Sequence, residues 1–307
     1  MSQNFANRKT LIKRILLMVP FLFLMGCNST AQNNSPYMSG LLLTEPEEIS
    51  PRSQVAIAHY TNTLFQVKMT PKERAEILFQ RGIAYDSMGL KSLARMDYLE
   101  AIKLNPQLAE AHNSMGVHYI QAGMYSQAYE AFDSTLEINP EYDFALLNRG
   151  IALYYGGREA LAAEDTLSFL EKDSSDPIRV LWHYIAANSS DDKSPEQAYL
   201  MLKEARVNLP EDKWATTLVD YYLQEATESD VIAKLISDVR SPTELNYRLC
   251  EAYFYIGKYH AKQGKFSVAE NYFKLSLSTN VYEYVEHKYA RIELDNLRRA
   301  RREAYTN

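Results

Sequence analysis

The sequence predicts an all-α protein in which about six helix pairs stack into a repeat superhelix, with one further helix at each end. Glycine recurs at intervals of 34 residues, at Gly82, Gly116 and Gly150. Hydrophobic residues make up 46% of the chain and charged residues 23%, as in folded globular proteins. The 307 residues include 11 Gly and 11 Pro, which is low for an all-β sandwich built on tight turns.

Other small and aromatic residues keep the same 34-residue frame. In each unit a second Gly follows seven residues after the first, and an Ala follows twelve residues after it. The members of the frame are Gly89, Ala94, Tyr98, Pro106, Gly123, Ala128, Phe132, Pro140, Gly157 and Ala162, and later Gly257, Gly264, Ala269 and Phe273. This frame resembles the tetratricopeptide repeat, a helix-turn-helix unit of 34 residues.

The residue types suit such a unit. Gly82 and Ala94 would lie where the two helices of one unit touch, because small side chains allow close approach. Gly89 would end the first helix in a left-handed conformation. Tyr98 would fill space between units, and Pro106 would end the second helix.

The frame is regular over residues 75–176 and again over 250–283, and it is degenerate between them. From Gly150 to Gly257 is 107 residues, or three periods plus five, so two irregular units with a small insertion fit there. We expect a helix at about 52–67 before the repeats and a capping helix at about 284–303 after them. The expected segments are a signal peptide 1–26, a lipidated Cys and tether 27–50, an N-terminal helix 51–74, three repeats 75–176, degenerate repeats 177–249, a C-terminal repeat 250–283, and a capping helix with a basic tail 284–307.

The first residues have the pattern of an export signal. Arg8, Lys9, Lys13 and Arg14 precede an apolar run of eleven residues, 15–25, which is too short to span a bilayer. The run ends in Leu-Met-Gly-Cys, which resembles the lipobox of bacterial lipoproteins and would make Cys27 the lipidated residue. The alternative is an ordinary signal with a chance Cys. In the lipoproteins that this segment resembles, Asp after the Cys favours the inner membrane, so the resemblance implies that Asn28 favours the periplasmic face of the outer membrane. Residues 28–50 suit a flexible tether.

The sequence favours a protein with no catalysis, no cofactor and no metal. The net charge of −6 argues against a nucleic-acid partner. The glycines between Gly257 and Lys265 do not have phosphate-loop spacing, and no pair of histidines has the spacing of a metal site. His260 reads as a packed core histidine and Cys250 as a buried structural thiol.

The first helices of the repeats would line the inner groove of the superhelix. Their inner residues predict an apolar groove with a few amides, and they lack the lysines with which other repeats of this type clamp a carboxylate. The predicted partner-binding residues are Phe79, Asn113, Val117, Leu147 and Ile151. The 23 tyrosines suggest interfaces as well as packing, in about equal parts. Arg298, Arg299, Arg301 and Arg302 give the last helix a basic end.

Several stretches narrow the resemblance further. Residues 81–90, 128–134, 254–259 and 285–290, and above all LNRGIALYYGGR at 147–158, resemble the NlpI family of tetratricopeptide-repeat outer-membrane lipoproteins. The resemblance implies a homodimeric, non-enzymatic adaptor. Such an adaptor binds a periplasmic PDZ-containing C-terminal-processing protease, a peptidoglycan endopeptidase and other murein hydrolases, and acts in cell-wall growth and cell division. The alternatives are an assembly lipoprotein for outer-membrane β-barrels or pili, and a murein-cleaving enzyme.

Overall fold

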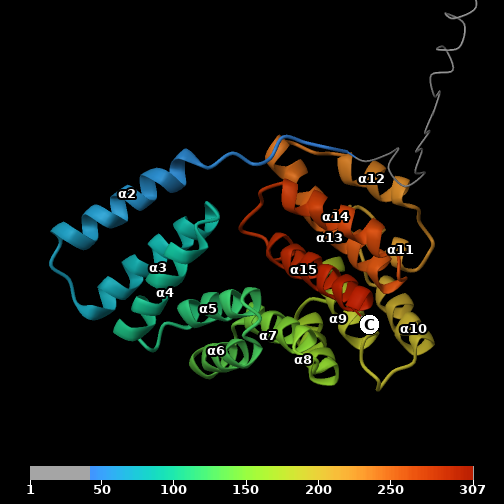
Figure 1. Ribbon diagram of the computed structural model, residues 1–307, viewed down its shortest axis with the longest axis horizontal. Helices are drawn as coiled ribbons and strands as arrows, with labels where there is room; N and C mark the ends of the chain where they lie inside the picture. Colours follow the sequence, from blue (N-terminus) through green and yellow to red (C-terminus); the bar gives the residue numbers. More distant parts are fainter. Residues whose placement is uncertain (1–41, 307) are drawn as a thin grey trace, which may run out of the picture. The chain divides into compact units, whose positions relative to one another are not determined.

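The computed structural model describes residues 42–306, and these residues form fourteen helices and no strand (Figure 1). The helices are α2 (Pro51–Gln66), α3 (Pro71–Ser87), α4 (Lys91–Leu104), α5 (Ala109–Gln121), α6 (Tyr125–Ile138), α7 (Asp143–Tyr155), α8 (Glu159–Lys172), α9 (Pro177–Ala187), α10 (Pro195–Arg206), α11 (Thr216–Tyr222), α12 (Glu228–Ile236), α13 (Pro242–Lys262), α14 (Phe266–Ser278) and α15 (Val285–Thr306). The predicted all-α fold is confirmed. The signal segment and Cys27 lie outside the described residues.

Consecutive helices pack as antiparallel pairs, which gives the repeat superhelix. The six pairs are α3 with α4, α5 with α6, α7 with α8, α9 with α10, α11 with α12, and α13 with α14. Helix α2 packs against α3 at the start, and α15 packs against α14 at the end. The predicted number of pairs and both flanking helices are therefore present.

Local sequence explains where many helices begin and end. At the start of α3, the Thr70 hydroxyl accepts a hydrogen bond from the Glu73 N–H, and the Glu73 carboxylate accepts one from the Thr70 N–H. Pro71 is the first helical residue, where a missing N–H costs nothing. The second glycine of the frame follows the first helix of its pair, with φ of 72° at Gly89 and 73° at Gly264. A side chain would strain the backbone there.

The first glycine of the frame makes room for an aromatic ring. A Cβ added at Gly116 would lie 2.4 Å from the Phe132 ring, and one added at Gly82 would lie 2.5 Å from the Tyr98 ring. Each ring therefore packs directly against the first glycine of its own helix pair. Tyr98 also contacts the next unit, with 5.7 Å between its ring centroid and that of His118, so it packs within its unit as well as between units.

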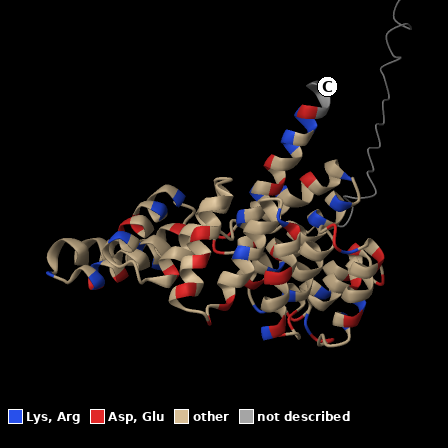
Figure 2. Ribbon diagram, turned by 90° about the horizontal axis from the view of Figure 1, so that it is seen from below, with Lys and Arg blue, Asp and Glu red and all other residues tan. Residues whose placement is uncertain are grey.

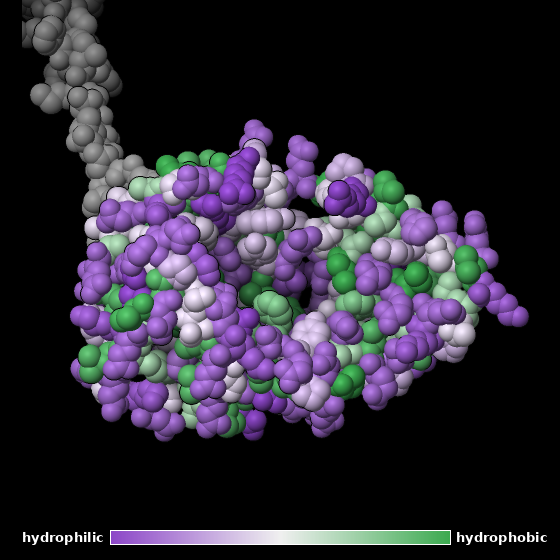
Figure 3. All heavy atoms as spheres, turned by 180° about the vertical axis from the view of Figure 1, so that it is seen from behind, coloured by the Kyte–Doolittle hydropathy of each residue, from purple (hydrophilic) through white to green (hydrophobic). Residues whose placement is uncertain are grey.

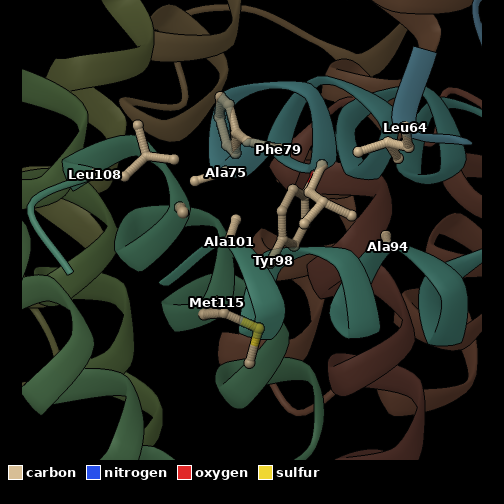
Figure 4. Close-up of a cluster of buried hydrophobic side chains, with 10 residues drawn as sticks. Leu64, Ala75, Phe79, Ala94, Tyr98, Ala101, Leu108 and Met115 are labelled. Carbon is tan, nitrogen blue, oxygen red and sulfur yellow. The ribbon is translucent and has the colours of Figure 1, made fainter. Parts of the chain in front are cut away.

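The first helix pair has a continuous core. Figure 4 shows Tyr98 in a buried cluster with Phe79 of α3, Leu64 of α2 and Met115 of α5. The Phe79 and Tyr98 ring centroids are 5.7 Å apart. This cluster joins the N-terminal helix to the first two repeats.

Two predicted boundaries fall inside helices. Helix α3 starts at Pro71, ahead of the expected repeat boundary at 75. Helix α13 starts at Pro242, so the boundary between 249 and 250 cuts through it. The repeat frame locates the contact points between helices, whereas the caps at Thr70 and Ser241 determine where these helices begin.

The described end of the expected tether, residues 42–50, is held against the last repeat. The Asn246 amide donates to the backbone oxygen of Glu45, 2.9 Å away, and the Glu47 N–H donates to the Thr279 carbonyl oxygen, 2.8 Å away. The Tyr253 hydroxyl donates to the carbonyl oxygen of Leu42. This corrects the prediction of a flexible tether for these nine residues, because Asn246 and Tyr253 of α13 and the backbone of Thr279 bind their backbone groups.

Candidate partner-binding surfaces

Four of the five predicted groove residues are buried in the repeat stack. Phe79, Val117, Leu147 and Ile151 are between 0% and 7% exposed. Asn113 is half-buried, and its Oδ1 accepts a hydrogen bond from the Asn148 amide at 3.1 Å. The expected apolar lining is therefore not an exposed surface at these positions. Packing between neighbouring helices covers the apolar side chains instead.

Helix α15 lies against the first helices of several repeats, where a ligand was expected. It contacts α5 and α13 as well as α14, and Figure 1 shows it beside α13 and α14. The Tyr155 hydroxyl of α7 donates to the Glu293 carboxylate at 2.7 Å. The Tyr289 ring meets the Trp182 ring of α9 edge to face, with centroids 6.3 Å apart. The predicted capping helix therefore also covers the inner surfaces of earlier repeats.

A buried ion pair fixes α15 to α13. The Lys258 Nζ lies 2.6 Å from Oε1 of Glu293 and 2.7 Å from the Tyr154 hydroxyl oxygen. Burial by itself would lower the pKa of Lys258, but the attraction of Glu293 and of Tyr154 outweighs it and raises that pKa. Lys258 is therefore charged, and its ammonium group finds its partners within the protein.

Beside this pair is a cavity of about 470 Å³, which we call the tyrosine pocket. Five tyrosines line it, and Lys258 and Glu293 also border it. The five are Tyr154, Tyr184, Tyr199, Tyr222 and Tyr259. The Tyr222 ring contacts those of Tyr184 and Tyr259, with centroids 5.7 and 5.2 Å away. The volume is in the range of small-ligand pockets, and rigid tyrosines are common anchors in protein interfaces.

A second cavity, of about 360 Å³, lies between α4, the turn from α5 to α6, and α15. We call it the basic pocket. Five cationic side chains line it: Lys91, Arg95, Lys288, Arg291 and Arg299. Of these five, only Arg299 belongs to the basic end predicted for the last helix. The two pockets share no lining residue.

Large apolar side chains are exposed on α2 and α4, the helices on either side of α3. Phe65 and Val67, at the end of α2, are 85% and 54% exposed, and Met96 of α4 is 66% exposed. Leu64 is the one buried residue of α2. Figure 3 shows hydrophobic surface on the part of the molecule formed by these first helices.

Two predicted core residues lie where expected. His260 is buried, its Nε2 lies 2.7 Å from the Glu228 carboxylate, and its ring stacks on Tyr272. Cys250 is a free, buried thiol, and burial raises its pKa to about 12. Such a thiol is unreactive near neutral pH because the thiolate is the nucleophile.

Residues 42–306 contain neither a membrane-spanning helix nor a metal-binding cluster. None of the helices there combines the length and apolar character needed to cross a membrane. No group of three His, Cys, Asp or Glu side chains in that range could hold a metal ion.

Comparison with known proteins agrees with the repeat frame. Residues 75–108 match the family model of the tetratricopeptide repeat, so the first regular unit is a repeat of this kind. A tetratricopeptide repeat protein from Parabacteroides merdae is 16% identical, with 80% of this chain and 90% of that chain covered and a TM-score of 0.47. PilF from Pseudomonas aeruginosa is 17% identical, with 73% and 99% covered and a TM-score of 0.42. The C-terminal part of a repeat protein from Cytophaga hutchinsonii is 16% identical, with 74% and 77% covered and a TM-score of 0.41.

Proposed function

We propose that this protein is a non-enzymatic scaffold that holds more than one partner protein at once. The observation that carries the proposal is the pair of pockets with separate linings on one stack of helices. Stacked helical repeats present extended surfaces to partners. Buried contacts between α15 and the earlier repeats would keep the two pockets at a fixed spacing.

The proposed partners are a periplasmic PDZ-containing C-terminal-processing protease and peptidoglycan hydrolases, an endopeptidase among them. The support is the resemblance of residues 147–158 and of the lipobox. Binding a protease and its substrate to one scaffold raises the effective concentration of each toward the millimolar range, even when each contact is weak. The scaffold would thereby regulate cell-wall degradation during growth and cell division.

The proposed location is the periplasmic face of the outer membrane, with Cys27 as the lipid anchor. Two or more acyl chains give stable anchoring where one gives marginal binding. The chain between Cys27 and residues 42–50 would link the anchor to the last repeat. Anchoring would keep the scaffold and its partners near the cell wall.

We further propose that the protein is a homodimer through the exposed apolar residues of α2 and α4. Phe65, Val67 and Met96 are far more exposed than the apolar residues of the repeat cores. Large exposed apolar surfaces mark interaction sites on soluble domains.

Reconstitution tests the scaffold function. The processing protease is incubated with the endopeptidase, with and without this protein, and the loss of endopeptidase is followed by gel. The protein should accelerate degradation well above the rate with protease alone. Tyr199→Ala, which opens one side of the tyrosine pocket, should reduce the acceleration. The neighbouring exposed residue provides the matched control, because Leu200→Ala should leave the acceleration unchanged. An unchanged rate on addition of wild-type protein contradicts the scaffold proposal.

A further inference from the structure

We propose that the basic pocket binds an acidic peptide segment of a partner protein. The proposal deepens the scaffold function and rests on it, since it gives the chemistry of one partner contact. Lys91 and Arg95 come from α4, and Lys288 and Arg291 come from α15, almost two hundred residues later. Figure 2 shows Lys and Arg along α15, the helix that ends at the label C. Folding therefore assembles the site from the first repeat and the last helix.

The charge in the pocket is not balanced by the protein around it. One carboxylate, Asp295, lines the pocket with the five cations. The Asp295 carboxylate faces Arg298, 3.5 Å away. Within residues 42–306, the side chains of Lys91, Arg95, Lys288 and Arg291 form no ion pair of 4 Å or less. The ion pairs of that range are formed by other side chains.

Arginines elsewhere in the repeats behave differently. Arg81 binds both carboxylate oxygens of Asp97, at 2.7 Å each. Arg149 does the same with Asp165. Arg81 and Arg149 are thus paired within their repeats, whereas Lys91, Arg95, Lys288 and Arg291 have no such partner in the described part of the chain, and an external anion would supply one.

The cations of the pocket repel one another. The pKa of Lys91 is lowered because the surrounding protein desolvates its ammonium group, although its side chain keeps access to solvent, and because Lys288 and Arg291 repel it. The nearby carboxylate of Asp86 offsets this in part, and Asp86 is itself bound by the His118 ring at 3.0 Å. A bound carboxylate would relieve this repulsion, so the arrangement favours an anionic ligand.

Two helix starts add to the positive potential. Leu90 is the N-cap of α4 and Met124 is the N-cap of α6, and neither side chain caps its helix. Ser92 and Tyr125, in the first turns of these helices, line the pocket. The unpaired N–H groups at a helix start attract anions.

The size and position of the pocket favour a peptide with several carboxylates. Its volume of about 360 Å³ exceeds what one small anion needs, and five cations can receive several carboxylates. The pocket is hollowed between α4, the turn from α5 to α6, and α15, and Lys288 within it is half-buried, so an extended segment fits it better than a flat membrane surface does.

Fluorescence anisotropy with the full-length protein tests the proposal. The probe is a dye-labelled octapeptide of alternating Asp and Glu, and the comparison peptide has Asn and Gln in their place. The acidic probe should bind and the amide peptide should not, and added salt should weaken binding. Arg95→Gln combined with Arg291→Gln should weaken binding about tenfold or more. Both side chains are exposed, so the fold should be kept, and circular dichroism checks this.

The control removes the same charge elsewhere. Lys68→Gln combined with Lys265→Gln, two exposed lysines outside the pocket, should leave binding within about twofold of wild type. Equal weakening in both double variants overturns the proposal, because binding would then follow net charge alone. Displacement of the probe by equimolar inorganic phosphate would instead indicate a small-anion site. Sedimentation with phosphatidylglycerol vesicles that depends on Arg95 and Arg291 would indicate a membrane site. Either result overturns the peptide assignment.

The two proposals fail in distinguishable ways. If wild-type protein accelerates degradation in the reconstitution but no acidic probe binds, the pocket assignment is wrong and the scaffold function stands. If the probe binds through Arg95 and Arg291 but degradation is not accelerated, the protease partnership is wrong and the pocket assignment stands.

Discussion

Lys258 of α13 and Glu293 of α15 form a buried ion pair, with 2.6 Å between Nζ and Oε1. Tyr154 and Tyr155 of α7 bind the two ends of the pair, each through a hydroxyl 2.7 Å from its partner. Three helices from distant parts of the chain therefore meet at one polar contact. The contact helps to hold α15, which borders both pockets, against α7 and α13.

Removing one member of the pair should be costly. Lys258→Met leaves the Glu293 carboxylate buried without its cation and should lower the free energy of unfolding by about 3–5 kcal/mol. The double variant Lys258→Met with Glu293→Leu should lose less than Lys258→Met alone, because no buried charge remains. The pair of Lys274 and Glu270 is the control: Lys274 is half-exposed and Glu270 keeps Arg301 as a second cation, so Lys274→Met should cost less than about 1 kcal/mol. Urea unfolding measures all three, and equal losses for Lys258→Met and Lys274→Met would contradict the argument.

The close approach in the second repeat should not tolerate a methyl group. Gly116→Ala would place a Cβ 2.4 Å from the buried Phe132 ring, so the ring or the helix must move. We expect a loss of about 1–3 kcal/mol. Asp191→Ala, in the exposed loop between α9 and α10, should stay within roughly 0.5 kcal/mol. Thermal unfolding compares the two, and similar melting temperatures would show that Gly116 is not a packing position.

Contacts of this kind explain why the fold could be predicted from the sequence. Gly116 and Phe132 lie sixteen residues apart, as Gly82 and Tyr98 do, so the same packing recurs at the same spacing and leaves a periodic pattern. The pair of Lys258 and Glu293 occurs once and leaves no such pattern.

The binding surfaces were harder to predict for a related reason. Helical periodicity shows that Val117 and Ile151 lie on an apolar face, but it does not show which element covers that face. The basic pocket brings Lys91 and Lys288 to one site, and the Glu47 N–H binds the Thr279 carbonyl oxygen. In both cases the two residues are far apart in the chain. Irregular contacts between distant residues have no local signal, and the basic residues of α4 and α15 are unremarkable until the fold brings them together.

Acid should destabilise the protein through two buried histidines. Burial lowers the pKa of His183 and of His287 from 6.5 to about 4 in each case. The unfolded chain therefore binds protons below about pH 6.5 that the folded chain does not bind until about pH 4, so stability falls as the pH drops through this window. At pH 5 each histidine should contribute a loss of about 2 kcal/mol.

A variant without one titrating ring separates this effect from other acid effects. His183→Gln should lose about 2 kcal/mol less than wild type between pH 7.5 and pH 5, measured by urea unfolding at each pH. His112→Gln is the control, because that ring is not buried and its removal should leave the pH dependence unchanged. The same slope in wild type and in His183→Gln would show that His183 is protonated in the folded state.

The proposed anchor can be tested in cells. Cys27→Ala removes the thiol that would carry the diacylglyceryl group, so the protein should leave the outer-membrane fraction and lose the mass of the acyl chains. Cys250→Ala is the control, because that thiol is buried in the last repeat and should not affect fractionation. Unchanged fractionation and mass in Cys27→Ala would refute the lipobox interpretation.

The proposed dimer surface makes the last prediction. Phe65 is 85% exposed at the end of α2, whereas Leu64 beside it is buried, so a charge at Phe65 can disturb an interface without entering the core. Phe65→Asp should convert the dimer into a monomer in sedimentation equilibrium, and the melting temperature of the monomer should remain close to that of wild type at low concentration. Leu200→Asp introduces the same charge at a 57% exposed residue of α10 and should leave the dimer intact. A wild-type protein that sediments as a monomer at micromolar concentration would remove the dimer proposal. A dimer that persists in Phe65→Asp would show that the dimer interface does not include the end of α2.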